Sequence, residues 1–242
     1  MGKKFKVFDT PGKLAENLAN QFKDAVNSSN NNFYIAISGG STPVTFFNRL
    51  AAKPFNDEIE WTKVHFFWCD ERCVPPENTD SNYGMTKINL FDKIKIPQDN
   101  IHRIKGESDP NQETVRYVNE IENNVCNDEN SLPRFDWVFL GMGEDGHTAS
   151  LFPNKNLLFI FSNIAGVAQH PQSGQKRVSL TFDVLNNAKH ITFVVTGKDK
   201  SKILYEIINE LPAGKNYPSA KIKPLNGNID WLIDKEAAFY LL

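Results

Sequence analysis

Short apolar segments alternate with amphipathic ones along this chain, and this alternation restricts the fold more than any other feature. Apolar runs of strand length lie at 33–37, 64–68, 135–140 and 191–195. Apolar residues at helical spacing predict helices over 12–26, from Pro43 onward, over 81–91 and 111–125, and around 203–208. Apolar strands that alternate with amphipathic helices indicate a mainly parallel sheet with helices on both faces.

The composition fits one α/β domain over residues 1–242, because no linker, repeat or low-complexity tract divides the chain. A net charge of -2 and a pI near 6.2 argue against a dedicated nucleic-acid binder. No apolar run approaches the ~20 residues of a membrane span, and no apolar signal core follows the N-terminal lysines. Three cysteines without a disulfide or zinc pattern indicate reduced thiols, so we expect a cytoplasmic protein. Residues 154–177 are the least regular part, and a long loop is expected there.

The first predicted strand ends in the sequence Ser-Gly-Gly-Ser-Thr-Pro at 38–43. In open parallel sheets, ligands bind beyond the carboxyl ends of the strands. Gly39 and Gly40 allow a tight turn, and free amides at a helix start suit a phosphate, together with the hydroxyls of Ser41 and Thr42. The alternative is a plain strand–turn–helix corner with Thr42 as the N-cap.

Further charged residues follow two other strands. The acid, acid and base at 70–72 come directly after an apolar strand, where charges are costly to bury without partners. Arg72 could clamp a phosphate and Asp70 could serve a sugar hydroxyl, although an ion-paired strand end is the alternative. Lys200 and Arg177 are additional candidates for binding an anion, and a solvated surface position is the alternative for both.

A glycine turn presents a histidine after the strand 135–140, in the sequence GMGEDGHTAS at 141–150. The G-x-G-x-x-G spacing does not indicate a dinucleotide site, because acids follow the second glycine and no ribose-binding acid lies about 20 residues on. His147 is a candidate general base, flanked by Asp145 and Thr148. The alternative is a capping or buried structural histidine.

The remaining histidines and cysteines offer no second site. Strand packing explains His65 and His190, whereas His102 and His170 have no visible partners. No H-E-x-x-H spacing is present and the Cys69–Cys73 pair has no completing ligands, so no metal is predicted.

Taken together, these segments resemble the 6-phosphogluconolactonase family. The resemblance runs in order through five blocks, which are 36–43, 70–75 with 80–84, 141–153, 177–181 and 196–197. It implies a Rossmann-like three-layer fold and hydrolysis of 6-phospho-D-glucono-1,5-lactone in the pentose phosphate pathway, without a cofactor or metal. It also implies functional coupling to glucose-6-phosphate dehydrogenase.

The resemblance assigns roles to individual residues. It implies that His147 is the general base, with Asp145 beside it. It places the phosphate on the turn at Gly40, Ser41 and Thr42, and on Arg72, Arg177 and Lys200. The chain departs from the family before Arg177, where it reads Gln-Ser-Gly-Gln-Lys at 172–176 in place of a proline-rich approach.

Two other functions remain open at this point. Glucosamine-6-phosphate deaminases resemble the same blocks but have Asp-Glu-Tyr where this chain has Asp-Glu-Arg at 70–72. A non-catalytic sugar-phosphate sensor would need an attached DNA-binding module, and we expect one domain to fill residues 1–242.

Overall fold

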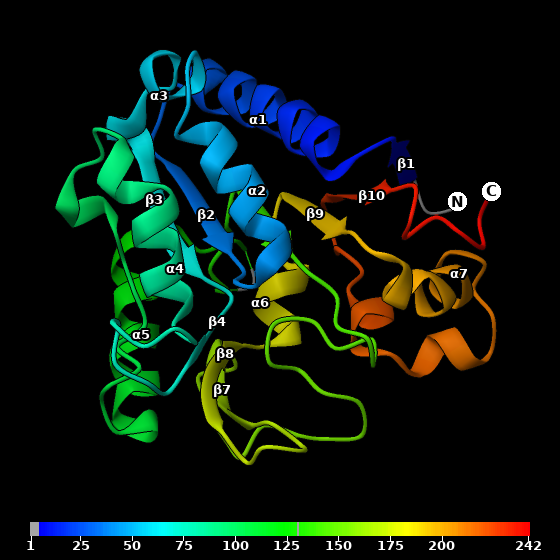
Figure 1. Cartoon of the computed structure of the whole chain (residues 1–242). Helices are drawn as coiled ribbons and strands as arrows, with labels where there is room; N and C mark the ends of the chain where they lie inside the picture. Colours follow the sequence, from blue (N-terminus) through cyan, green and yellow to red (C-terminus); the bar gives the residue numbers. More distant parts are fainter. Residues whose placement is uncertain (1–4, 130) are drawn as a thin grey trace.

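The computed structural model describes residues 5–129 and 131–242, and only the backbone of Ser41. A six-stranded sheet lies at its centre, and every neighbouring pair of strands in it is parallel (Figure 1). In spatial order the strands are β1 (Phe5–Phe8), β10 (Asn228–Asp234), β9 (His190–Val195), β5 (Trp137–Leu140), β2 (Phe33–Ile37) and β3 (Val64–Trp68). The predicted parallel α/β sheet is therefore confirmed.

The predicted helices are present in the predicted order, and two short helices that were not predicted lie between them. The helices are α1 (Pro11–Ser28), α2 (Ser41–Leu50), α3 (Phe55–Glu58), α4 (Asn82–Asn89), α5 (Pro110–Asn124), α6 (Phe182–Asn186) and α7 (Ser201–Ile208). The two that were not predicted are α3 and α6. Short 3₁₀ turns lie at Trp61–Lys63, Phe91–Lys93, Gln98–Asn100, Lys198–Lys200, Ala213–Asn216 and Pro218–Lys221. None of the helices in the described ranges has both the length and the hydropathy needed to cross a bilayer.

Helices cover both faces of the central sheet. Helix α1 packs against β1 and β10, and α2 packs against α1 and β9. Strand β3 illustrates both faces, since consecutive strand residues point to opposite sides. The Phe66 ring lies 5.1 Å from Phe91, whereas the next ring, Phe67, lies 6.4 Å from Tyr117 of α5. The three-layer Rossmann-like arrangement is thus confirmed.

The apolar stripe of α1 supplies the centre of the core. Leu14, Leu18, Phe22 and Val26 are all buried, as their four-residue spacing predicted. Five aromatic rings surround the Phe22 ring at centroid distances of 6.1–6.4 Å. They belong to Phe33, Phe46, Trp61, Trp137 and Phe139. This packing holds α1, α2 and the middle strands together, and so fixes the strand ends that carry the polar sequences.

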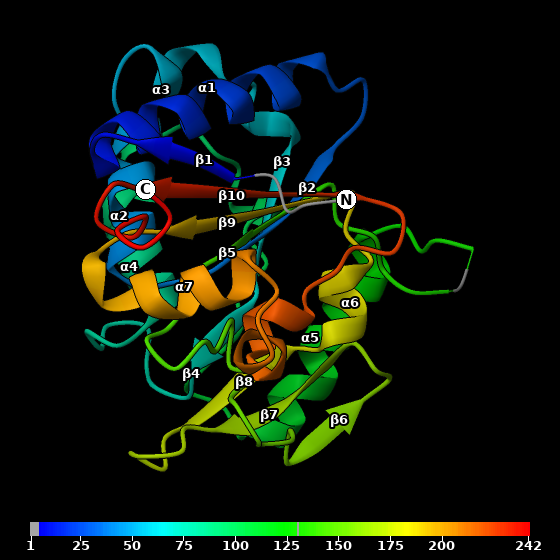
Figure 2. The ribbon, with the colours of Figure 1, turned by 90° about the vertical axis from the view of Figure 1, so that its right-hand side faces the viewer.

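The prediction of a long loop at 154–177 is wrong. Strands β6 (Phe159–Phe161), β7 (Ala165–Gln169) and β8 (Lys176–Leu180) lie there and join β4 (Asp70–Arg72) in a second, antiparallel sheet of order β4-β8-β7-β6. Figure 2 shows this sheet beside α5, below the central one. Small residues hid β7 from the sequence analysis, because Ala-Gly-Val-Ala at 165–168 lacks the bulky alternation that marks a strand. Residues 154–158, 162–164 and 170–175 connect these strands, and the last of these segments contains the loop that was predicted.

The two end strands of the chain were also missed. Strand β1 has only four residues and lies at the edge of the sheet, and β10 has acids within and at the end of its apolar segment. Another difference concerns α2, which begins at Ser41 rather than at Pro43. Its N-cap is Gly40 with no side-chain hydrogen bond, so Thr42 is not the cap.

Candidate active site

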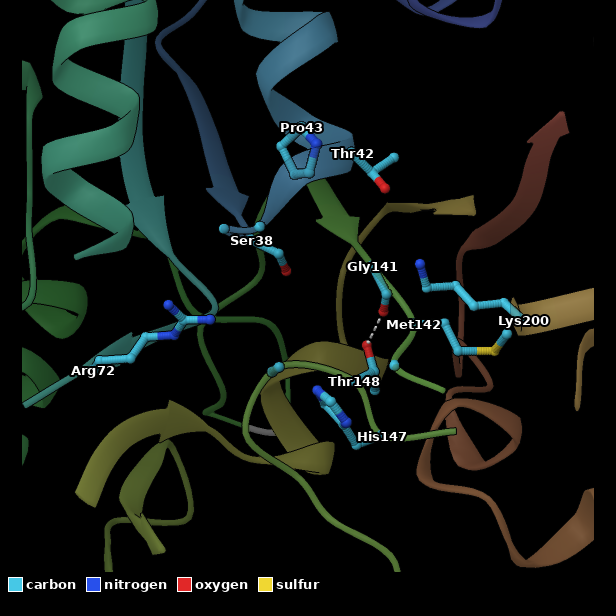
Figure 3. Close-up of a pocket in the computed structure, with 13 residues that line it drawn as sticks. Ser38, Thr42, Pro43, Arg72, Gly141, Met142, His147, Thr148 and Lys200 are labelled. Carbon is cyan, nitrogen blue, oxygen red and sulfur yellow. Dashed lines mark hydrogen bonds between the residues drawn. The ribbon is translucent and has the colours of Figure 1, made fainter. Parts of the chain in front are cut away.

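The polar strand ends converge on one pocket at the carboxyl edge of the central sheet (Figure 3). The turn after β2 meets the turn after β5 there, and β4 and the turn after β9 complete the walls. The lining residues are Ser38, Gly39, Gly40, Thr42, Pro43, Arg72, Gly141, Met142, Gly143, His147, Thr148, Ala149 and Lys200. Sequence reasoning placed most of these polar residues correctly because parallel strands present their carboxyl ends on one edge.

One wall of the pocket is built to face an anion. Gly40 has φ +102°, a conformation that side-chain-bearing residues rarely adopt, and it leads directly into the ten residues of α2. The first amides of a helix have no partners within it, and the helix dipole adds positive potential at the same point. The Thr42 Oγ1 lies 2.9 Å from the Thr196 Oγ1, which ties this turn to the end of β9. The side chain of Ser41 lies outside the described part of the structure.

Lys200 adds a cation beside this wall. It lies at the end of a short turn, Lys198–Lys200, just before α7. Its Nζ donates a hydrogen bond of 3.2 Å to the carbonyl of Thr196. Figure 3 shows the Lys200 side chain running toward Thr42 and Gly141. An anion at the start of α2 would therefore meet both helix amides and an ammonium group.

Two arginines lie side by side on the second sheet, but only one lines the pocket. In the register of β4 and β8, Arg72 is directly opposite Arg177. The Nη1 of Arg72 donates to the carbonyl of Asp80 at 2.6 Å, while its Nε makes no hydrogen bond within the described part of the chain. The guanidinium points into the pocket (Figure 3). Arg72 thus keeps donor capacity for a ligand.

Arg177 and Asp70 form a buried cluster with Ser150 instead of lining the pocket. The Ser150 Oγ donates to Asp70 Oδ2 at 2.7 Å, and the Nη1 of Arg177 lies 3.9 Å from the same oxygen. Burial lowers the pKa of Arg177, and the Asp70 charge opposes this shift. Asp70 is 4% exposed, so it supports the site from beneath.

His147 and Asp145 form a hydrogen-bonded pair in the turn after β5. The Nδ1 of His147 lies 2.6 Å from Asp145 Oδ1, and the same oxygen accepts the backbone N–H of His147 at 3.1 Å. Burial raises the pKa of Asp145, but the hydrogen bonds from His147 outweigh it and lower this pKa below its ordinary value. A carboxylate facing Nδ1 holds the proton there, which leaves the lone pair on Nε2. Nε2 is thus the ring nitrogen of His147 that does not face Asp145.

Glycines shape the turn that carries this pair. Gly146 has φ +77°, and a Cβ on Gly143 would lie 2.2 Å from the His147 ring. The Gly143 N–H donates to the His147 carbonyl at 2.9 Å and closes the turn. Thr148 donates its hydroxyl to the Gly141 carbonyl at 2.8 Å, so this flanking hydroxyl holds the turn in shape.

One histidine outside the pocket was misjudged. His102 has two partners, because its Nδ1 lies 2.6 Å from Glu120 Oε1 and its Nε2 lies 3.0 Å from His65 Nδ1. These partners are far apart in sequence, at 65 and 120, so no local pattern revealed them. His170 accepts backbone N–H groups of residues 172 and 173 through its own Nδ1. Neither histidine is among the pocket residues.

Within residues 5–129 and 131–242, no cluster of three His, Cys, Asp or Glu side chains could hold a metal ion. We expect that dialysis against an excess of chelator leaves the hydrolytic activity that the family resemblance implies within about twofold of the untreated sample. The reason is that His147 and Asp145 alone fall short of the roughly three ligands of a catalytic metal. The measurement is steady-state kinetics before and after chelation. Activity that disappears and returns with added zinc or magnesium would contradict this expectation.

The similarity of this chain to known proteins places it in one family. A family model described as glucosamine-6-phosphate isomerases/6-phosphogluconolactonase matches residues 9–231, and the chain belongs to that family. Among its relatives, a 6-phosphogluconolactonase of Haemophilus influenzae is 44% identical over 230 residues, which cover 95% of this chain and 96% of that protein.

Solved structures agree with this assignment. The crystal structure of the devB protein is 40% identical, with a TM-score of 0.92 over 99% of both chains. That of 6-phosphogluconolactonase from Trypanosoma brucei is 26% identical, with a TM-score of 0.86 over 99% of both chains. The resemblance, the fold and the enzyme class predicted from the sequence, a carboxylic ester hydrolase of the 6-phosphogluconolactonase type, are confirmed.

Proposed function

We propose that this protein hydrolyses 6-phospho-D-glucono-1,5-lactone to 6-phospho-D-gluconate in the oxidative pentose phosphate pathway, with His147 as the general base. The observation that carries the proposal is one pocket that holds both an anion-binding helix start and a His–Asp pair. A sugar phosphate lactone offers a dianion for the first and an electrophilic carbonyl for the second. The names of the relatives support the same substrate.

Binding begins with the phosphate. The amides at the start of α2 and the Lys200 ammonium supply donors to its oxygens, and Arg72 adds a guanidinium from the opposite wall. Arg177, held by Asp70 and Ser150 just outside the lining, adds positive potential. Fixing the phosphate at one end places the lactone carbonyl, C1, toward His147, and this positioning lowers the entropic part of the barrier.

His147 then activates water. Its Nε2 accepts a proton from a water molecule while the water oxygen forms a bond to C1, and the carbonyl electrons move onto the carbonyl oxygen. Arg72 or a backbone amide of the pocket supplies a donor to that oxygen. When the carbonyl forms again, the bond from C1 to the ring oxygen breaks, and the ring oxygen takes the proton back from His147. The product is an open-chain acid with a new hydroxyl group.

Asp145 stabilises His147 both before and after the ring accepts the proton. It keeps the Nδ1 proton in place before the attack and faces the imidazolium while the proton is on Nε2. General-base action of this kind contributes roughly 10²–10⁴-fold to a rate.

The alternative within the family is deamination of glucosamine 6-phosphate. Arg72 favours the lactonase, because a deaminase has a tyrosine at the corresponding position of its Asp-Glu-Tyr segment. An arginine there adds a cation to the pocket. In the proposed function that cation is a further donor to the phosphate of the lactone.

The proposed function is tested by measuring how strongly hydrolysis depends on the phosphate group of the substrate. Hydrolysis of 6-phospho-glucono-1,5-lactone is measured by coupling the product to a 6-phosphogluconate dehydrogenase, and unphosphorylated glucono-1,5-lactone serves as the control substrate. We expect kcat/KM to be roughly 10²-fold or more higher for the phosphorylated lactone, since two charge-assisted contacts are worth that much. Equal rates on both lactones would remove the phosphate site from the account.

Substitution of Arg72 separates binding from chemistry. We expect Arg72→Ala to raise KM about tenfold, the low end for a hydrogen bond to a charged group, while kcat changes less than about threefold. Arg103→Ala, which removes an arginine ion-paired to Glu107 outside the pocket, is the matched control. An unchanged KM would make Arg72 a structural residue, and a fall in kcat alone would make it the oxyanion donor.

We also propose a single functional domain over residues 1–242, a cytoplasmic location and coupling to a glucose-6-phosphate dehydrogenase that supplies the lactone. Co-purification or channelling measurements with such a dehydrogenase test the last of these.

A further inference from the structure

Two polar side chains are buried directly behind the pocket without lining it. Glu71 and Asn82 are each 2% exposed, and neither is among the described residues that line the cavity. Burying a carboxylate and an amide is costly unless each finds hydrogen-bond partners. Their partners therefore indicate what they hold in place.

The Glu71 carboxylate ties strand β4 to the start of helix α4. Its Oε1 accepts the backbone N–H groups of Arg72 at 2.7 Å and Asn82 at 2.8 Å. Its Oε2 accepts the backbone N–H of Tyr83 at 2.7 Å and the hydroxyl of Ser81 at 3.1 Å. Burial raises the pKa of Glu71 to about 7, against the opposing effect of the three backbone hydrogen bonds. Three of these bonds hold the backbone at Arg72 and at the first turn of α4, and the fourth holds the side chain of Ser81, the N-cap of α4.

The Asn82 side chain extends this connection to the phosphate turn. Its Nδ2 donates to the carbonyl of Asp70 at 2.8 Å, on β4. Its Oδ1 lies only 1.8 Å from the point that a Cβ on Gly39 would occupy, so the amide fills the space directly beneath that glycine. One side chain thus contacts both the turn after β2 and the strand that carries Arg72.

We propose that Asn82 is a positioning residue for phosphate recognition, which sets the spacing between the Gly39–Gly40 turn and the guanidinium of Arg72. The donors of the turn and of Arg72 come from different sheets, and they bind one phosphate only if their separation matches it. Displacements of about 1 Å are enough to lose such an interaction. This inference rests on the proposed function only in taking the ligand to carry a phosphate.

The experiment compares Asn82→Asp and Asn82→Ala with Asn89→Ala, a control near the end of the same helix. Asn89→Ala loses a hydrogen bond to the Met85 carbonyl and another that Asn48 donates to its Oδ1. Asn82→Asp keeps the volume but places an oxygen against the Asp70 carbonyl. Binding of inorganic phosphate and of 6-phosphogluconate is measured by calorimetry, beside steady-state kinetics and thermal melts. We expect both Asn82 variants to bind either ligand about tenfold more weakly, with KM raised to match and kcat changed less than about threefold.

A second pair of variants tests the contact with the turn itself. Gly39→Ala places a methyl group where the Asn82 amide lies, so we expect at least a tenfold loss of phosphate affinity. In Gly39→Ala/Asn82→Ala the smaller side chain makes room for that methyl group. The double variant should then bind phosphate no more weakly than Gly39→Ala alone, which is the signature of coupled positions.

Several results would overturn the proposal. They are wild-type affinity in a folded Asn82 variant, the same loss in Asn89→Ala, a loss confined to kcat, or additive losses in the double variant. A wild-type protein that binds neither phosphate nor 6-phosphogluconate would also overturn it. A wild-type protein that binds phosphate but does not hydrolyse the lactone would contradict the proposed function alone, and the binding measurements would still decide the role of Asn82.

Discussion

His147→Ala is expected to lower kcat for lactone hydrolysis by roughly 10²–10⁴-fold, the contribution of a positioned general base. The binding of 6-phosphogluconate should change little, because the proposed phosphate site, at the start of α2 and Lys200, does not include His147. The fold should be kept, since the His147 side chain is 27% exposed and its hydrogen-bond partner Asp145 is half exposed. Steady-state kinetics and a thermal melt measure both effects.

His170→Ala is the matched control for this substitution. The ring of His170 lies 5.2 Å from Phe152, and Phe152 lies 5.0 Å from His147, so the two histidines occupy the same part of the molecule. His170 does not line the pocket, and its variant should keep kcat within about threefold. A folded His147→Ala protein with near wild-type kcat would remove His147 from the base role.

Asp145→Asn is expected to lower kcat by about 10²-fold and to leave KM nearly unchanged. The substitution keeps the shape of the side chain but removes the negative charge that faces the imidazolium. It also offers an amide N–H₂ to Nδ1, which favours the tautomer with its proton on Nε2, where no proton can be accepted. The half-exposed position of Asp145 keeps the expected loss below that of a fully buried partner, because solvent screens the charge.

Glu144→Gln provides the comparison, since it removes a charge one residue away that is not the one bonded to His147. It should retain activity within about threefold. If Asp145→Asn and Glu144→Gln show the same small change, the charge in this turn acts only on the general potential. In that case the hydrogen bond between Asp145 and His147 does not orient the base.

Much of the central sheet could be predicted because its middle strands are unbroken apolar runs. Strands β2, β3 and β9 are buried on both faces, which produces runs such as Phe-Tyr-Ile-Ala-Ile at 33–37. Helix α1 was equally clear from its four-residue spacing. The second sheet could not be predicted, because β4 and β6 have only three residues each and β7 consists mostly of small residues. The pairing of Arg72 with Arg177 also joins β4 to a strand distant in sequence.

The residues of the candidate site, like the strands, could be predicted only in part. The pocket positions of Gly40, Thr42, Arg72, His147 and Lys200 followed from the rule that polar strand ends meet at one edge. The position of Asp70 did not, because its contact with Ser150 joins residues 80 positions apart, and the sequence gives no sign that the carboxylate turns inward. Asn82 was overlooked for a similar reason, since its role depends on the space beneath Gly39.

The central claim is that this pocket hydrolyses a phosphorylated lactone, and a direct comparison of two substrates tests it. The purified protein is given 6-phospho-glucono-1,5-lactone or glucosamine 6-phosphate under the same conditions, and acid formation and ammonia release are followed. We expect lactone hydrolysis well above the spontaneous rate, lowered roughly 10²–10⁴-fold by His147→Ala, and no ammonia release. Ammonia release from glucosamine 6-phosphate, with lactone loss at only the spontaneous rate, would contradict it.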